Sequence, residues 1–127
     1  MRKNPDFKKD TCYSRDEIFN KLGGSKQYYL PMKNGQVLYG AFRKDLNPDA
    51  PKIVLPGKGP IIERSAHILA TQKNPIPVFI KCDINNWKYM GDFVVKKLVE
   101  DSKVIEKHAT KTHRADITMV LYLEEAK

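Results

Sequence analysis

The segment NNWKYMGDFVV, residues 85–95, contains the one tryptophan of the chain. Two asparagines predict a turn at its start. The alternate positions that follow are Trp87, Tyr89, Gly91, Phe93 and Val95. Strand side chains point to opposite faces in turn, so this spacing predicts a strand with one face that is aromatic first and aliphatic further on. The preceding segment VFI, residues 78–80, predicts a buried strand that completes a hairpin.

Two helices are predicted upstream of this hairpin. Ser14 and Glu17 have the spacing of a capping box, and Gly23-Gly24 ends the first helix. Within residues 27–44, the dipeptide Asn34-Gly35 indicates a hairpin between two β segments. The second helix lies in residues 57–73, where Pro60 suits the first turn and apolar residues form one face.

The remaining segments complete a prediction of the fold class. Residues 102–114 are polar and basic and predict a loop around a short helix or ragged strand. Residues 116–125, DITMVLYLEE, are apolar on both faces, as in a central strand. Strands outnumber helices, so we expect an α+β fold with a mixed, strongly curled sheet or a small β-barrel and two main helices. We expect one domain over residues 1–127, with a basic segment and helix in 1–26 and a barrel-like core in 27–124.

Charge is the most informative feature of the composition. The chain has 23 Lys and Arg against 15 Asp and Glu, a formal net charge of +8. Such a balance favours association with a polyanion, and DNA or RNA binds through counterion release. The lysines are scattered rather than gathered in one tract, and the alternative is a basic protein whose charge only keeps it soluble.

Location and cysteine usage are predicted from what the sequence lacks. No apolar run approaches the length of a membrane span, and the basic N-terminus is followed by no apolar signal region. We therefore expect a cytoplasmic or nuclear protein that is neither secreted nor bound to a membrane. Cys12 and Cys82 form no CxxC motif, which favours two reduced cysteines.

Catalytic motifs are poorly represented. There is no GxSxG, and the five-residue spacing of His108 and His113 suits neither helical metal ligation nor HExxH. Asp45 and Asp49 are present without the acidic and lysine pattern of a strand-borne nuclease site. We expect no enzyme, no catalytic residue, no metal and no cofactor, and a small metal-dependent nuclease using these aspartates and a histidine is the alternative.

A loop and a set of aromatic residues are the better candidates for binding. PGKGP, residues 56–60, leads into a helix N-terminus, where backbone N–H groups and Lys58 suit a DNA-backbone phosphate. A tight turn between a strand and a helix is favoured over nucleotide binding at this loop. Aromatic residues between basic ones suit base stacking, worth about 1–3 kcal/mol per base, and a hydrophobic core is the alternative. These residues are Tyr28, Tyr29, Tyr39, Phe42, Trp87 and Tyr89.

The order of elements resembles a known family. The stretch from YLPMKNGQVLYGAF through IPVFIK to WKYMGDFVV, followed by RADITMVLYLEE, looks like a small PUA-like β-barrel, and the resemblance spans residues 27–124. It is similar in particular to the SRA-like reader domains attached to modification-dependent restriction enzymes. The resemblance rests on the hairpin strand with its aromatic-x-Tyr-x-Gly pattern rather than on a diagnostic motif.

This resemblance implies a DNA-binding module of restriction or defence systems that flips a modified base of duplex DNA into an aromatic pocket. Its partner is then double-stranded DNA, and a nuclease domain or subunit accompanies it. The pocket residues would be Tyr39, Phe42, Asp45, Asn47, Trp87 and Tyr89, with Asp45 and Asn47 reading the base edge. An Asx turn at Asn47 is an equally plain interpretation. The phosphate-binding residues would be Arg43, Lys58, Lys88, Lys96 and Lys97. An RNA-binding PUA-like module is a further alternative.

Overall fold

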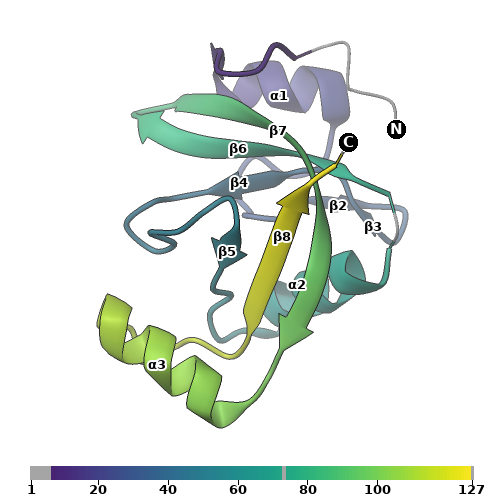
Figure 1. Ribbon diagram of the computed structural model, residues 1–127. Helices are drawn as coiled ribbons and strands as arrows, with labels where there is room; N and C mark the ends of the chain where they lie inside the picture. Colours follow the sequence, from purple (N-terminus) through teal and green to yellow (C-terminus); the bar gives the residue numbers. More distant parts are fainter. Residues whose placement is uncertain (1–6, 73, 127) are drawn as a thin grey trace.

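The computed structural model describes residues 7–72 and 74–126, and Figure 1 shows their arrangement. The first six residues of the predicted basic segment lie outside the described residues. In chain order the elements are β1 (Cys12–Tyr13), α1 (Arg15–Leu22), β2 (Met32–Lys33), β3 (Gln36–Val37), β4 (Gly40–Phe42), β5 (Ile53–Val54), α2 (Pro60–Thr71), β6 (Ile76–Asp83), β7 (Asn86–Val99), α3 (Ser102–Thr112) and β8 (Val120–Glu125).

One mixed sheet organises the molecule. Its strand order is β4-β6-β7-β8-β5, and β1 pairs separately with β7. Strands β4 and β6 are parallel, and the other pairs in this sheet are antiparallel. Strands β2 and β3 form the hairpin predicted at Asn34-Gly35. The described residues thus form an α+β fold with an open sheet.

The predicted barrel, with its strongly curled sheet and two main helices, is wrong. Among the described residues β4 and β5 are the two edges of the sheet and do not pair, so the sheet is not closed. The polar segment 102–114 contains a third helix, α3, which Asp101 caps by accepting hydrogen bonds from the N–H groups of Lys103 and Val104. The capping residue lies just outside the segment that looked like a loop.

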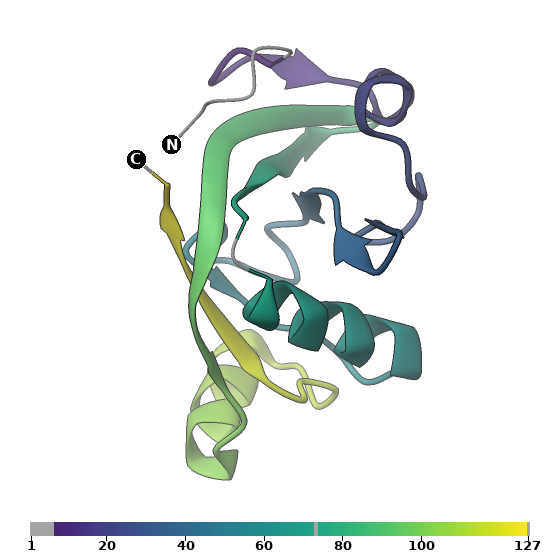
Figure 2. The same ribbon diagram turned by 90° about the vertical axis from the view of Figure 1, so that its right-hand side faces the viewer.

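Strand β7 serves two parts of the sheet. Its first half pairs with β6 and β1, and its second half pairs with β8. Figure 2 shows that the ribbon of β7 turns between these halves. Met90 has no partner where Tyr89 pairs with Phe79 and Gly91 with Val78, which is a β-bulge, and Gly91 has a φ of +114°. A bulge of this kind bends a strand and reverses the facing of the residues beyond it.

The bulge corrects the prediction that Trp87, Tyr89, Gly91, Phe93 and Val95 share one face. Trp87 and Tyr89 belong to an apolar cluster with Ile18 of α1. Phe93 belongs instead to the main core, which lies between the sheet and α2, and Val95 packs against it. A third cluster joins α3 to β5 and β8.

Candidate functional site

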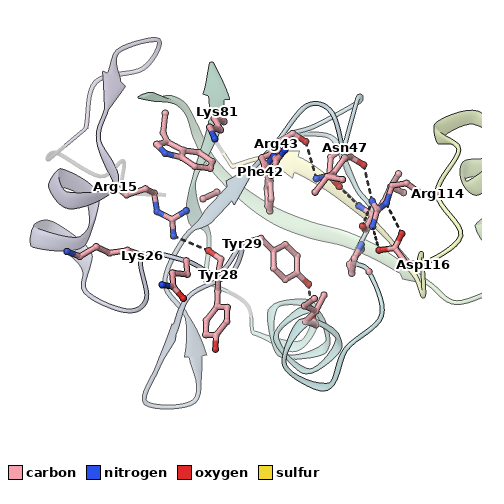
Figure 3. A pocket seen from close by; sticks show the side chains of 18 residues that line it. Arg15, Lys26, Tyr28, Tyr29, Phe42, Arg43, Asn47, Lys81, Arg114 and Asp116 are labelled. Carbon is pink, nitrogen blue, oxygen red and sulfur yellow. Dashed lines mark hydrogen bonds and ion pairs between the residues drawn. The ribbon is translucent and has the colours of Figure 1, made fainter. Parts of the chain in front are cut away.

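A cavity of about 460 Å³ lies between the two unpaired edges of the sheet (Figure 3). Strand β4 contributes Phe42, and Leu55 follows directly after β5. Helix α1, residues 26–29, the end of β6 and the start of β7 supply one side of the lining, and residues 114 and 116 supply the other. The cavity therefore collects residues that lie far apart in the sequence.

Two polar side chains connect the segments that follow β4 and β5. The N–H of Leu55 donates to Oδ1 of Asn47 at 2.8 Å, and Nδ2 of Asn47 donates to the carbonyl of Arg43 at 3.3 Å. Nη1 of Arg114 donates to the carbonyl oxygens of Leu46 and Leu55, at 3.0 and 2.9 Å. The backbone groups that these side chains satisfy lie just beyond the ends of β4 and β5. Both side chains also line the cavity.

Arg15 is the most unusual residue of the lining. It is the first residue of α1 and only 9% exposed. Its Nη2 donates to the carbonyl oxygens of Ser25 and Tyr28, at 3.2 and 3.0 Å, and its buried Nε has no hydrogen-bond partner. None of the ion pairs within residues 7–72 and 74–126 includes Arg15. A buried cation without an acidic partner is costly, and an anionic ligand would offset that cost.

Trp87 lies beside this cation. The Cζ of Arg15 is 5.1 Å from the centroid of the Trp87 ring, and Nζ of Lys81 is 5.9 Å from the same centroid. The indole Nε1 is buried and has no hydrogen-bond partner, as is the case for Nε of Arg15. Each of these two donors therefore carries the penalty of a buried polar group without a partner, about 1–3 kcal/mol.

The other charged groups of the lining are largely neutralised. Arg114 and Asp116 form two hydrogen bonds of 3.0 Å, which lower the pKa of Asp116 below its ordinary value and keep it ionised. Lys26 pairs with Asp16 at 2.8 Å, and Arg43 pairs with Asp45. Lys81, like Arg15, takes part in none of the ion pairs between described residues. The unbalanced positive charge thus lies around Trp87.

The structure brings together only some of the predicted base-pocket residues. Phe42, Asn47 and Trp87 line the cavity. Tyr39 is fully buried, and its hydroxyl donates to the carbonyl of Ser25. Tyr89 is buried beside Phe79, and its hydroxyl donates to Asp92 at 2.6 Å. Asp45 lines a second, more open hollow that shares Arg43 and Lys81 with the cavity.

The predicted phosphate-binding residues are more dispersed. Arg43 lines the cavity, whereas Lys58, Lys88, Lys96 and Lys97 do not. At the PGKGP loop, the N–H of Gly59 donates to the carboxylate of Glu63 at 3.0 Å, so this helix N-terminus already has an acidic side chain. Lys97 is exposed and lies 5.3 Å from the ring of Tyr122, on the second half of β7.

The sequence prediction missed Arg15, Lys81 and Arg114 as members of the site. Arg15 precedes Ile18 and Leu22 by three and seven residues, so it lies on the apolar face of its helix, where a charge is a detectable anomaly. Lys81 follows Phe79 by two residues and shares its face by the period of the strand. No local pattern marks Arg114, because its partners Leu46 and Leu55 are distant in the sequence.

The described residues contain neither a metal-ligand cluster nor a membrane-spanning helix. Within the described part of the chain, no group of three or more His, Cys, Asp or Glu side chains is placed to hold a metal ion. No helix among the same residues has the length and apolar character that crossing a bilayer requires.

Comparison with known proteins gives one match. The sequence model of one protein family, described as "Domain of unknown function (DUF6697)", matches residues 12–115, which include every cavity residue discussed above except Asp116. No curated protein and no solved structure matches the chain. The match spans most of the sequence and both halves of the cavity lining, and the chain belongs to the DUF6697 family of domains of unknown function.

Proposed function

We propose that this domain binds nucleic acid and takes one unstacked nucleotide into the cavity beside Trp87. The observation that carries the proposal is Arg15, a cation that is nine-tenths buried, has no acidic partner among the described residues and lies over an indole ring. A group that is both anionic and flat would satisfy this corner, and a nucleotide has both properties. The sequence-level hypothesis of duplex DNA with a modified base is a finer form of this proposal.

The phosphate would lie between Arg15 and Lys81. Both cations lie within 6 Å of the Trp87 ring centroid, at 5.1 and 5.9 Å, and arrive from different elements, α1 and β6. Arginine suits a phosphate because its planar guanidinium donates several hydrogen bonds in a fixed geometry. Lysine adds a point charge that adapts its position on a flexible stem.

The base would lie on the aromatic part of the lining. Tyr28 stands exposed at the rim of the cavity, and the buried side chains of Trp87 and Phe42 form part of its wall. A volume of about 460 Å³ lies in the range of small-ligand sites, about 300–1,000 Å³, so the space suits one nucleotide rather than a stacked strand. Stacking on such rings tolerates any base, and it supplies about 1–3 kcal/mol per base.

The side chain of Asn47 is used for support rather than for recognition in this arrangement. Both its oxygen and its nitrogen are engaged with backbone groups, at Leu55 and Arg43. We therefore assign recognition of the base edge, predicted for Asn47, to a side chain that has no hydrogen bond to the backbone. Gln27 lines the cavity and is exposed, and it is the neutral hydrogen-bonding side chain that we assign to this role.

The experiment that tests the proposal uses the intrinsic fluorescence of Trp87, the one tryptophan of the chain. Single-stranded DNA, single-stranded RNA, plain duplex DNA and duplex DNA carrying 5-methylcytosine, 5-hydroxymethylcytosine or N6-methyladenine are titrated at two salt concentrations. Stacking on the indole quenches its emission. We expect quenching that persists at the higher salt, and a modified duplex that exceeds its unmodified twin would establish the finer form.

Matched variants separate the site from general charge. Lys81→Gln should lower the affinity about tenfold, whereas Lys103→Gln, which removes the same charge from exposed α3, should leave it nearly unchanged. Trp87→Phe keeps the core filled and removes the signal, so its affinity is measured by anisotropy of labelled oligonucleotides. Binding without quenching that both lysine variants weaken equally would contradict a nucleotide in this cavity.

A further inference from the structure

The two cysteines of the chain lie against each other. Cys12 is in β1 and Cys82 is in β6, 70 residues apart in the sequence, and their Sγ atoms are 3.3 Å apart. Both residues are exposed, so a dissolved oxidant has access to them. The sequence alone gave no reason to bring them together, because they form no motif.

The backbone around the pair has room to adjust. At residues 87 and 88, strand β7 has β1 on one side and β6 on the other, so the two thiols meet over the start of β7. Cys82 is the unpaired residue of a bulge between Lys81 and Asp83, and β1 is only two residues long. A disulfide needs the sulfur atoms to close to about 2.05 Å, a small movement for an unpaired residue and a short edge strand.

We propose that Cys12 and Cys82 are a redox modification site, which a small-molecule disulfide such as oxidised glutathione converts into one intramolecular disulfide. This bond fastens β1 to the β6–β7 hairpin. The proposal does not depend on nucleic-acid binding, because it follows from the placement of two thiols.

The reaction proceeds by two exchanges. The Cys12 thiolate attacks one sulfur of oxidised glutathione, forms a mixed disulfide and releases one glutathione thiolate. The Cys82 sulfur then attacks Cys12, forms the protein disulfide and releases the second glutathione thiolate. The two protein thiols lose two protons and two electrons, and both are taken up by the two glutathione products. Burial and the contact with Cys12 raise the pKa of the Cys82 thiol, which keeps Cys82 protonated until Cys12 has reacted.

The bond would also connect two parts of the candidate site. Arg15 follows Cys12 by three residues, and Lys81 directly precedes Cys82. Tyr13 pairs with Trp87, and both cations lie within 6 Å of the centroid of the Trp87 ring, at 5.1 and 5.9 Å. Oxidation would therefore fix the segments that carry Arg15 and Lys81 relative to each other.

The test starts from the fully reduced chain, which is equilibrated with excess oxidised glutathione, denatured and labelled with a maleimide. We expect a monomer that has lost two hydrogens in mass and takes up no label. The oxidised chain should also melt roughly 5–15 °C higher than the reduced chain, because the bond closes a long loop. Cys12→Ser and Cys82→Ser should each keep one bound glutathione.

Several results would overturn the proposal. These are a chain that carries two glutathiones, a disulfide-linked dimer, or two thiols that still label after equilibration. An oxidised chain that melts at or below the reduced one would show that the bond does not fasten the fold. Circular dichroism of the two serine variants provides the folding control, since both positions are exposed.

Discussion

Asn47 connects the segment that follows β4 to the segment that follows β5. It is buried, and its side chain accepts from Leu55 N–H and donates to the Arg43 carbonyl. We expect Asn47→Ala to lower the free energy of unfolding by about 1–3 kcal/mol, because the Leu55 N–H would be left without an acceptor. Urea denaturation measures this change. The exposed Asn74→Ala is the control, and equal stability of both variants would contradict a supporting role for Asn47.

His108 makes stability depend on pH. It is buried, and its pKa lies below the ordinary value of 6.5 because of burial and then the neighbouring Lys111, while Asp49 opposes this and Lys107 adds to it. The folded chain therefore binds this proton less readily than the unfolded chain. Its contribution is fully present above pH 6.5 and is lost as the pH falls through the folded pKa.

We therefore expect the wild-type chain to lose stability between pH 8 and pH 5.5, and His108→Gln to lose less. Urea denaturation at the two pH values measures both slopes. His67 and His113 are exposed and are the same in the wild type and the variant, so their contributions to the pH dependence of stability cancel in the comparison. A variant with the same pH dependence as the wild type would show that His108 is not the cause.

Among single residues, some members of the site could be predicted from the sequence and others could not. Trp87 and Phe42 stood out because aromatic residues at strand positions are countable in the sequence, and both line the cavity. Tyr39 and Tyr89 have the same local pattern and are buried like Trp87 and Phe42, but they do not line the cavity, since the position of a side chain depends on which element packs over a strand. Local sequence does not contain that information.

Among the elements, β7 shows where periodicity stops being informative. The period of two places Trp87 and Tyr89 together correctly, and it fails after the unpaired Met90. The glycine that follows, Gly91, is the one local sequence signal of this bulge. The alternating pattern treats Gly91 as an ordinary position of the strand. The central position of β8 was predicted from its two apolar faces, and it is confirmed by pairing with β7 and β5.

The short strand β4 depends on Gly40. A Cβ at this position would lie 2.5 Å from Cζ and 2.9 Å from Cε2 of Phe42, whose ring is only 1% exposed and cannot move aside freely. We expect Gly40→Ala to cost about 1–3 kcal/mol through overpacking and to shift Phe42 in the cavity wall. Thermal unfolding measures the cost. Adding Phe42→Leu should recover part of it, and a single variant as stable as the wild type would contradict this packing.

For the molecule as a whole, the sequence predicted the helices and strands better than it predicted whether the sheet closes into a barrel. An α+β chain with a hairpin at Asn34-Gly35 and a capped first helix was within reach, because turns and caps are local signals. Whether two edge strands pair depends on contacts between segments that are distant in the sequence. Here Asn47 and Arg114 occupy the backbone groups near β4 and β5, and the sheet stays open.

The net charge of +8 and the cavity cations make different predictions about salt. A diffuse field acts through all cations alike, whereas a phosphate held between Arg15 and Lys81 releases counterions at that place. We expect the slope of log K against log salt for a short single strand to fall by about 0.7 in Lys81→Gln and in Arg15→Gln, and to stay nearly constant in Lys103→Gln. Anisotropy titrations at four or more salt concentrations give the slopes, and circular dichroism checks that Arg15→Gln retains α1. Equal slopes in all three variants would assign binding to overall charge, and the unpaired Arg15 would then need a ligand other than nucleic acid.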